Sequence, residues 1–323
     1  MLRPFVRLTA ALCLSLVLPV ASAADWPTKP IRIINPFPAG GGTDTFARPM
    51  AAVLTRNLGQ QVIIENQGGA GGTLGSANAA RATPDGYTFF MGAIHHTIAP
   101  SVYSKLSYDI EKDFIPITVA GIVPNVVVVH PKHPFTTFKD LIDYAKANPG
   151  KLNFASSGAG TSQHLSGELV KLATKTDMVH IPYKGMGPAV QDFVAGHVDL
   201  LFDGMGASAA QIKAGKAKAL GLMAAKRTPG FPDIPTLDEL GYPGLEVSSW
   251  YALWAIKGTP PEIVDRMYKE VLKAFDDPIC KTAWANASAE FGAMPPAEFA
   301  KFIRSEIERW SRVAKSANIR VEN

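Results

Sequence analysis

Short apolar segments alternate along the chain with longer segments in which apolar residues recur every three or four positions. The short segments are rich in β-branched and aromatic residues, which is typical of buried strands. They predict strands at residues 31–35, 61–65, 87–91, 126–130, 152–156, 178–183, 198–203, 219–223 and 251–256. Alternation of this kind predicts an α/β fold with largely parallel sheets.

The longer segments predict amphipathic helices. Phe46, Met50 and Leu54 lie four residues apart and would form one apolar stripe. Similar patterns occupy residues 138–145, 165–172, 263–275 and 296–310. The first helix poses a problem, because Pro49 falls near its fifth position if Asp44 caps it, and proline there removes a hydrogen bond and clashes with the preceding turn. Either the first turn is kinked or the regular helix begins nearer Pro49.

Two changes in the pattern divide the chain. The apolar strand at residues 126–130 is followed by a proline and leads into a new series of strands and helices. A Gly-Tyr-Pro-Gly turn at residues 241–244 marks the second change. We therefore expect two lobes, residues 24–125 with 244–323 and residues 126–243. Two connecting segments would form a hinge between them, and a single continuous domain with a helical tail is the alternative.

The first 23 residues have the features of a secretory signal peptide. Arg3 and Arg7 form a short basic region, and residues 8–20 are apolar. Residues 21–23 read Ala-Ser-Ala, a small-residue cleavage site. The apolar part is too short for a stable membrane anchor, which is the alternative. We expect a mature chain that begins at Ala24 and is exported, which in a bacterium means to the periplasm.

Composition indicates a soluble, globular protein. The 323 residues are 47% hydrophobic and 19% charged. Two of the 32 Lys and Arg residues lie in the leader, so 30 remain against 28 Asp and Glu residues, without a basic block. Nucleic-acid binding therefore has no electrostatic basis. Cys280 is the single cysteine after the leader, which excludes an intrachain disulfide.

A loop rich in small residues, between a predicted strand and a predicted helix, occurs twice in the sequence. Residues 36–44, Pro-Phe-Pro-Ala-Gly-Gly-Gly-Thr-Asp, lie between a predicted strand and a predicted helix. Residues 156–164, Ser-Ser-Gly-Ala-Gly-Thr-Ser-Gln-His, have the same place in the other predicted lobe. The first N–H groups of a helix have no partner within it, and glycines allow a ligand to approach them. If both loops face one cleft, these groups and the hydroxyls of Thr43, Thr161 and Ser162 would hold an anion. Two ordinary strand-to-helix turns are the alternative.

Other polar or aromatic side chains lie where predicted strands end. His95 and His96 follow the strand at 87–91 and would point into the cleft or make loop hydrogen bonds. Asp203 ends the strand at 198–203. Its carboxylate would accept a hydrogen bond from a ligand or from a donor at the hinge, or it would cap a helix. Phe37 would pack over the ligand or fasten its loop to the core.

Motifs for other chemistries are missing from the sequence. The phosphate-binding patterns G-x-x-x-x-G-K-[ST] and G-x-G-x-x-G do not occur. None of the seven histidines is paired as H-x-x-x-H, so we expect neither a metal site nor a cofactor. G-x-S-x-G is also missing, although a catalytic triad assembled in space from Ser157, His164 and Asp203 stays open.

Characteristic segments read WPTKPIRIINPFPAGGGTD, VIIENQGGAGGTLGS, ATPDGY, NFASSGAGTSQHLSGELV, HIPYKGMGPAVQDFVAGHVDLLFD and FPDIPTLDELGYPG. Together and in this order they resemble the Bug-type extracytoplasmic solute receptors of the tripartite tricarboxylate transporters, over almost the whole mature chain. The resemblance implies a two-lobed, type II-like periplasmic binding-protein fold. Its ligand is a small carboxylate held in the interlobe cleft, without a cofactor or catalytic residues.

The resemblance also implies which residues lie at the ligand. They are Phe37, Ala39, Gly40, Thr43, Asp44, Ser157, Gly158, Thr161, Ser162, His164 and Asp203. We add Gly41, because a carboxylate introduced there would take the place of the anion. His95 and His96 occupy a segment where many relatives have small or hydroxylated residues, and they would favour a second anionic group or an aromatic ring on the ligand.

The resulting expectation is a monomeric receptor without enzymatic activity. It would bind a small carboxylate, close, and deliver the ligand to integral-membrane permease subunits. The alternatives are the same fold acting as the ligand-sensing partner of a two-component sensor, and a periplasmic hydrolase.

Overall fold

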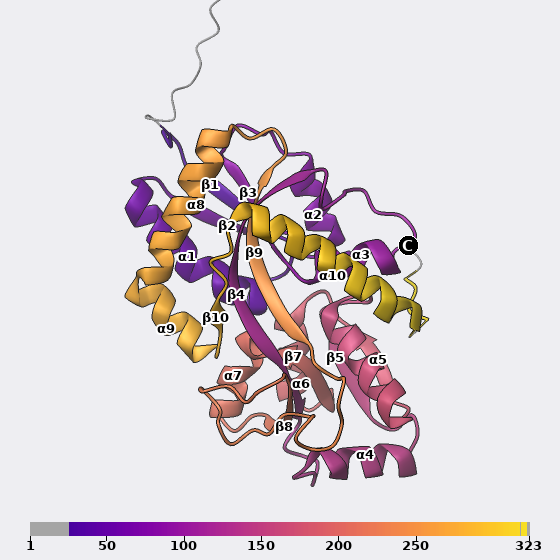
Figure 1. Ribbon diagram of the computed structural model, residues 1–323. Coiled ribbons are helices and arrows are strands. Elements are labelled where there is room, and N and C mark those ends of the chain that lie inside the picture. The colour runs from indigo at the N-terminus through magenta and orange to yellow at the C-terminus, as the bar shows by residue number, and fades with distance from the viewer. Residues whose placement is uncertain (1–25, 317, 322–323) are drawn as a thin grey trace, which may run out of the picture.

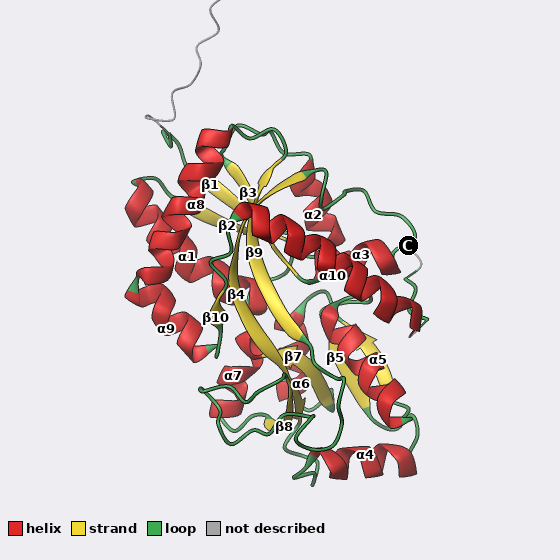
Figure 2. Ribbon diagram, in the orientation of Figure 1, coloured by secondary structure: helices red, strands yellow, loops and turns green. Residues whose placement is uncertain are grey.

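The computed structural model describes residues 26–316 and 318–321. They form two lobes, one above the other in Figures 1 and 2, and each lobe has a β-sheet flanked by helices. The predicted signal peptide, residues 1–23, lies outside the described residues.

The sheet of the first lobe has the strand order β2-β1-β3-β9-β4, and β10 also pairs with β4. Its strands are β1 (Ile31–Asn35), β2 (Val62–Asn66), β3 (Thr88–Ala93), β4 (Phe114–Val129), β9 (Ser248–Ile256) and β10 (Glu290–Phe291). β1 is parallel to β2 and β3, whereas β9 is antiparallel to β3 and to β4.

The sheet of the second lobe continues from β4 in the order β4-β7-β5-β6, and β8 also pairs with β4. The added strands are β5 (Asn153–Ser156), β6 (Val179–Pro182), β7 (Leu200–Gly204) and β8 (Lys218–Met223). β5 is parallel to β6 and β7, but β4 is antiparallel to β7 and β8. The prediction of largely parallel sheets is therefore wrong, because the long strands β4 and β9 run against their neighbours.

Strand β4 belongs to both lobes. Its first part, from Phe114 to Pro124, pairs with β9, and its last part, from Asn125 to Val129, pairs with β7 and β8. The sequence pattern predicts only the last part, because prolines and a glycine interrupt the first. The predicted lobe boundary at residue 126 falls within this strand, and the exact lobe ranges stay a prediction.

Helices cover both faces of these sheets (Figure 2). They are α1 (Gly42–Leu58), η1 (Ala70–Gly72), α2 (Thr73–Ala80), α3 (His95–Val102), α4 (Phe138–Ala147), α5 (Ser162–Thr174), α6 (Met186–Val194), α7 (Met205–Lys213), α8 (Pro261–Asp276), α9 (Pro278–Asn286) and α10 (Pro296–Ser316). Of the helices in the described part of the chain, none is both long enough and apolar enough to cross a membrane.

The hydrophobic core has two parts, one on each face of the sheets, and both run through the two lobes. Val126 and Val128 of β4 join residues of α1, α6, α7, α8 and α9. Val127 and Val129 face the other way and join residues of α2, α3, α4, α5 and α10. This alternation is the period of two expected for a strand covered on both faces.

Helix α1 begins before the position that the sequence suggested. Gly41 is the N-cap, and the helix continues through Pro49 to Leu58. Asp44 lies in the first turn and does not cap the helix. The regular helix therefore does not begin near Pro49, and its first turn lies directly behind the glycine-rich loop.

Candidate functional site

The N-terminus of α1 is the first part of the candidate site. Gly41 is extended, with φ −89° and ψ 176°, and no side chain caps the helix. The N–H groups of Gly42, Thr43 and Asp44 therefore lie where helical geometry provides no partner. A Cβ at position 42 would overlap the hydroxyl of Tyr251. Glycine is thus required at position 42 for this helix terminus to pack against Tyr251. The backbone N–H groups of the terminus are then available to an anion.

Asp44 holds the first loop (residues 36–44) together. Its Oδ2 atom accepts from the Gly40 N–H at 3.1 Å and from Arg48 Nε at 2.7 Å, and its Oδ1 atom accepts from Asn66 Nδ2 at 3.2 Å. Asn66 also donates to the carbonyl of Phe37 at 2.8 Å. Both oxygens of the carboxylate therefore accept hydrogen bonds from the protein, and these bonds stabilise the loop.

The N-terminus of α5 is the second part of the site. Thr161 is its N-cap, without a side-chain cap. The second loop (residues 156–164) turns at Gly158 and Gly160, with φ of +138° and +75°, which favours glycine. The Thr161 hydroxyl donates to the Gly158 carbonyl at 2.7 Å and so stabilises this turn. A Cβ on Gly158 would lie 3.0 Å from the Cα atom of Gly71, so this loop contacts the first lobe closely.

A chain of hydrogen bonds supports the second loop. The Ser157 hydroxyl donates to Gln163 Oε1 at 2.7 Å, and Gln163 Nε2 donates to Asp203 Oδ1 at 3.4 Å. Ser208 donates to the other carboxylate oxygen at 2.8 Å. Burial raises the pKa of Asp203 to about 6. Gly204, and not Asp203, is the N-cap of α7, so Asp203 orients Gln163 and does not cap a helix.

His95 connects the two parts of the site. Its Nδ1 atom accepts from the backbone N–H of Ser162 at 3.0 Å and lies 3.1 Å from the Ser162 hydroxyl. The Phe37 ring packs edge-on against the imidazole, with 5.0 Å between centroids. Burial lowers the pKa of His95 to about 3, so the imidazole is uncharged near neutral pH. His95 lies on α3 and Ser162 on α5, so this bond joins the two predicted lobes.

The other two predicted histidines point elsewhere. His96 is buried, and its Nδ1 atom lies 3.1 Å from the Tyr108 hydroxyl. His164 accepts from the Gly160 N–H at 3.1 Å and stacks on His180 with 3.9 Å between ring centroids. Both support the surrounding structure in this conformation.

A small cavity lies between the two helix N-termini. Its lining residues are Phe37, Gly41, Gly42, Thr43, His95, Ser157, Gln163, Met186 and Tyr251. Its volume of about 10 Å³ is roughly the space that one water molecule needs. The structure thus brings the two predicted loops and His95 together around one cavity, and a carboxylate can enter only if the lobes separate.

The lobes touch directly beside this cavity. A Cβ on Gly187 would overlap the carbonyl oxygen of Ala39, and one on Gly40 would lie 3.8 Å from the Cα atom of Gly187. The Tyr103 hydroxyl donates to the carbonyl of Ala159 in the second loop at 2.7 Å. The structure is therefore a closed arrangement in which both loops are in contact with the opposite lobe.

Sequence reasoning missed four residues that line the cavity: Gly42, Gln163, Met186 and Tyr251. Gln163 stands within the second loop, between two predicted site residues, and its place at a helix start could have revealed it. Met186 follows a glycine at another helix start. Tyr251 has no local indication, because its role depends on β9 passing behind the first turn of α1.

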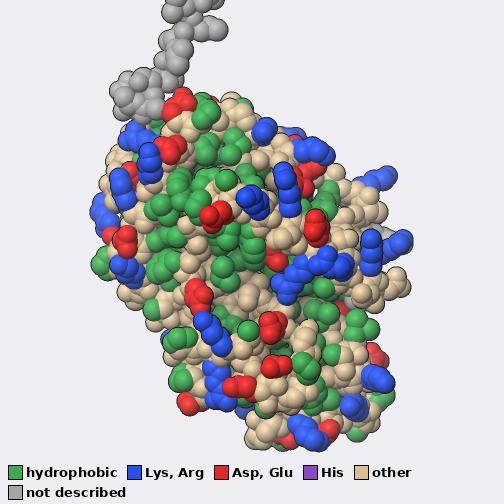
Figure 3. Space-filling model, in the orientation of Figure 1, with side chains coloured by type: hydrophobic (Ala, Val, Ile, Leu, Met, Phe, Trp, Pro, Cys, Tyr) green, Lys and Arg blue, Asp and Glu red, His purple; other side chains and the backbone are tan. Residues whose placement is uncertain are grey.

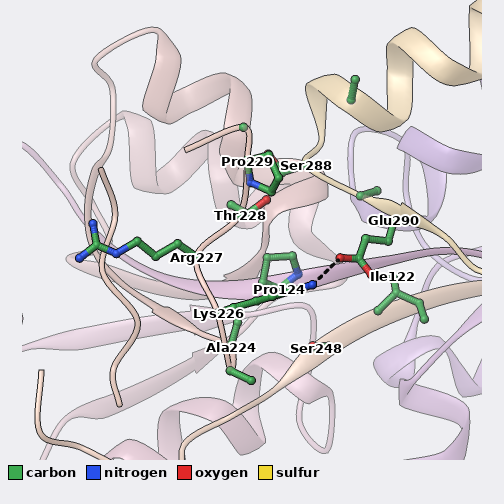
Figure 4. A pocket seen from close by; sticks show the side chains of 14 residues that line it. Ile122, Pro124, Ala224, Lys226, Arg227, Thr228, Pro229, Ser248, Ser288 and Glu290 are labelled. Atoms are coloured by element: carbon green, nitrogen blue, oxygen red, sulfur yellow. Dashed lines mark ion pairs between the residues drawn. The ribbon is translucent and has the colours of Figure 1, made fainter. Parts of the chain in front are cut away.

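A larger cavity, of about 520 Å³, lies against β4, β9 and β10 (Figure 4). Lys226 and Glu290 form an ion pair at 3.8 Å beside it, and Arg227 extends away from the other labelled side chains. It shares no lining residue with the cavity between the helix N-termini. We place the candidate site at the smaller cavity, because backbone and side-chain donors converge there.

The charges on the face drawn in Figure 3 do not indicate another kind of site. Acidic and basic side chains are both spread over the face drawn in Figure 3. Among the residues that the structure describes, no group of three or more His, Cys, Asp and Glu side chains is placed to hold a metal ion.

Known proteins share both the sequence and the fold. The profile of the tripartite tricarboxylate transporter family receptor matches residues 46–319. Protein BugT of Bordetella pertussis is 36% identical over 303 residues, which is 93% of each chain. The periplasmic binding protein BugD superposes with a TM-score of 0.89 and 35% identity, covering 92% of this chain and 100% of that one. MatC from Rhodopseudomonas palustris with bound malate superposes with a TM-score of 0.85 and 34% identity, covering 89% and 99%. The fold is that of the two-lobed periplasmic binding proteins.

Proposed function

The chain belongs to the tripartite tricarboxylate transporter receptor family, and from this premise we propose that it captures a small carboxylate between its two lobes and passes it to a membrane permease. The observation that carries the proposal is that the first turns of α1 and α5 both contribute residues to the lining of one cavity. Each terminus supplies the positive end of a helix dipole. At α1 the N–H groups of the first turn have no helical partner, whereas at α5 the N–H of Ser162 is bonded to His95 Nδ1 and leaves the N–H groups that follow it.

The chemistry of the lining fits a carboxylate. Each helix terminus is equivalent to roughly half a positive charge, so two termini balance about one carboxylate. The side chains that line the cavity are uncharged, and Thr43, Ser157 and Gln163 add polar groups. MatC, a relative with the same fold, is described with bound malate, which is a carboxylate.

The arrangement of the polar side chains favours binding over hydrolysis. The hydroxyl of Ser157 donates to Gln163, while His164 is engaged with the Gly160 N–H and stacked on His180. Asp203 is bonded to Gln163 and Ser208. Ser157, His164 and Asp203 are therefore used separately as supports and do not form a nucleophile, a base and an orienting acid.

The remaining parts of the proposal concern the cell. We infer export to the periplasm by the predicted signal peptide, with cleavage near Ala23, and action as a monomer that docks on the permease in its closed form. N-terminal sequencing of the exported protein tests the first inference, and uptake of the identified ligand in cells with and without the receptor gene tests the second.

Calorimetric titration with a panel of mono- and dicarboxylates of three to six carbons tests ligand capture. We expect saturable binding of at least one member, without turnover of the bound compound. The absence of binding across the panel would refute the proposal. Product formation that disappears in Ser157→Ala would establish a hydrolase in its place.

A further inference from the structure

The side chain of Asn125 lies at the junction of the two lobes. Asn125 begins the part of β4 that pairs with the second-lobe strands, opposite Gly204 of β7 and Met223 of β8. Its backbone N–H donates to the carbonyl of Val247, directly before β9, at 3.0 Å. The side chain is completely buried. Asn125 therefore lies between backbone segments of both sheets, and its amide group needs partners inside the protein.

The amide joins one element of each lobe. The Ser249 hydroxyl of β9 donates to Asn125 Oδ1 at 2.7 Å, and Asn125 Nδ2 donates to the Ser166 hydroxyl of α5 at 3.2 Å. All three side chains are at most 1% exposed. An asparagine amide accepts at one end and donates at the other, so it connects two hydroxyl groups in a defined order. We call these three residues the Asn125 bridge.

At its second-lobe end, the Asn125 bridge reaches the helix that contributes to the cavity. α5 begins at Ser162, so Ser166 lies about one helical turn after that start. Gln163, in the first turn, lines the cavity. Because successive turns of a helix are joined by backbone hydrogen bonds, a bond to Ser166 also restricts the first turn of α5 relative to β9.

At its first-lobe end, the bridge lies beside the cavity wall. Tyr251 lines the cavity and lies two residues after Ser249 on the same strand, so both side chains are on one face of β9. Burial, and after it the nearby Asp203 carboxylate, raises the pKa of the Tyr251 hydroxyl, while a hydrogen bond with Ser249 lowers it. A Cβ on Gly204 would lie 3.2 Å from both the Ser249 Cβ atom and the Tyr251 hydroxyl, so β7 also packs closely here.

The polarity of the bridge gives this contact a geometry that an apolar core contact would not have. A hydrogen bond requires a short distance and a favourable angle, whereas apolar attraction has no direction. Moving α5 away from β9 at this point would leave buried polar groups without partners, which is costly. A fully satisfied buried network of this kind favours one arrangement of the elements that it joins.

We propose that Asn125 is a positioning residue for ligand capture, whose amide holds the first turn of α5 at the place relative to β9 and α1 where both helix termini act on one anion. This inference rests on the proposed function and adds a residue outside the cavity on which the closed arrangement depends. Asn125 acts through Ser249 and Ser166 and does not touch the ligand.

Distances between the lobes test the positioning without any ligand. Spin labels on Asn57→Cys and Lys146→Cys, at exposed positions of α1 and α4, report the distance by pulsed electron resonance, while Cys280 is buried. We expect Asn125→Ala to shift or broaden the distance distribution of the labelled protein. Identical distributions would overturn the proposal. This result decides it even if no carboxylate of the panel binds, in which case the proposed function fails separately.

A matched control separates positioning from stability. Thr118 is a buried residue in the first-lobe part of β4, and its hydroxyl donates to the carbonyl of Met294 at 2.8 Å. Thr118→Ala should lower the stability in urea unfolding without changing the distance distribution or the affinity. In calorimetry with a carboxylate that the wild type binds, Asn125→Ala should raise the dissociation constant at least about fivefold. An unchanged constant would overturn the proposal while leaving carboxylate capture intact.

Asn125→Asp tests the amide chemistry at nearly constant shape. A protonated carboxyl group has one donor and one acceptor, as the amide has, whereas a carboxylate only accepts and would be buried near Asp203. The wild type is measured at each pH, because Asp203 and Tyr251 lie in the same region. We expect the ratio of the variant's dissociation constant to that of the wild type to be near one at pH 5 and to rise toward pH 8. A ratio raised equally at both pH values would overturn the proposal, because a neutral donor and acceptor would then not replace the amide.

Discussion

Replacing Gly187 with alanine tests whether the closed arrangement in this structure is the one that holds the ligand. Gly187 lies near the start of α6, and the three atoms nearest to a Cβ there belong to Ala39 and Gly40 of the first loop. The Cβ would overlap the Ala39 carbonyl oxygen, while the other two atoms lie at 3.4 and 3.8 Å. The added methyl group therefore obstructs the contact between the lobes and leaves the packing inside the second lobe unchanged.

The expected magnitude follows from this single overlap. Forcing an extra methyl group into a packed contact typically costs about 1–3 kcal/mol. Because about 1.4 kcal/mol corresponds to a tenfold change in affinity, the dissociation constant for the carboxylate should rise roughly 5- to 150-fold. The free energy of unfolding should not fall, since alanine favours a helix over glycine by up to about 1 kcal/mol.

Titration calorimetry with a carboxylate that the wild type binds, together with urea unfolding of the free protein, measures both quantities. Gln191→Ala, at an exposed position of the same helix, is the control and should change neither. An unchanged affinity in Gly187→Ala would refute the reasoning, because the bound state would then not contain this contact. A parallel loss of stability and affinity would indicate local damage to α6 and not an obstructed closure.

Three further substitutions test other parts of the site. Gly41→Asp places a carboxylate at the N-cap of α1, where it would cap the helix in place of the ligand. Carboxylate binding should be lost in titrations while the unfolding midpoint is kept. Retained affinity would refute the assignment of this loop. Tyr103→Phe removes the hydroxyl that donates to the Ala159 carbonyl, so the dissociation constant should rise about two- to tenfold; an unchanged constant would show that this bond is not part of the bound state. Burial raises the pKa of Asp203 to about 6. Between about pH 4 and 6 the native protein therefore binds more protons at this group than the unfolded chain does. The stability that Asp203 contributes falls as the pH rises through that range. Asp203→Asn should therefore gain stability relative to the wild type, by up to about 3 kcal/mol above pH 6 in urea unfolding, and a difference that does not vary with pH would contradict the raised pKa.

The sequence pattern predicts the fold well wherever a strand is short and apolar. The predicted strand at 31–35 matches β1 in full, and the predicted helix from Pro296 onward is α10. The pattern fails at β4, because Pro116, Gly121 and Pro124 interrupt its first part. That part nevertheless pairs with β9 along its length, with irregular register near Pro116 and Gly121. Long-range pairing overrides local propensity there, and no local pattern reports strand direction.

The candidate site shows the same limit at the level of single residues. Adjacent histidines look equivalent in the sequence, but a helix begins at His95, so successive side chains point about 100° apart. His95 therefore reaches the cavity and Ser162, while His96 turns to Tyr108. Asp44 likewise follows the glycine-rich loop, yet its carboxylate is used by Gly40, Arg48 and Asn66. Position in a motif identifies the loop, and the helix start decides which side chain faces the ligand.

The distribution of charge explains why binding and closure must occur together. Neither helix terminus alone balances a carboxylate, because each supplies roughly half a charge. The nearby acidic groups do not cancel this attraction, since Asp44 is paired with Arg48 and Asp203 is buried behind Gln163. Only when the second lobe brings α5 toward α1 do two termini act on one anion. The cavity, which here has room for about one water molecule, must widen to enclose a carboxylate. The carboxylate therefore binds the closed form more tightly than the open form, and this difference in affinity is what shifts the population of the receptor toward closure.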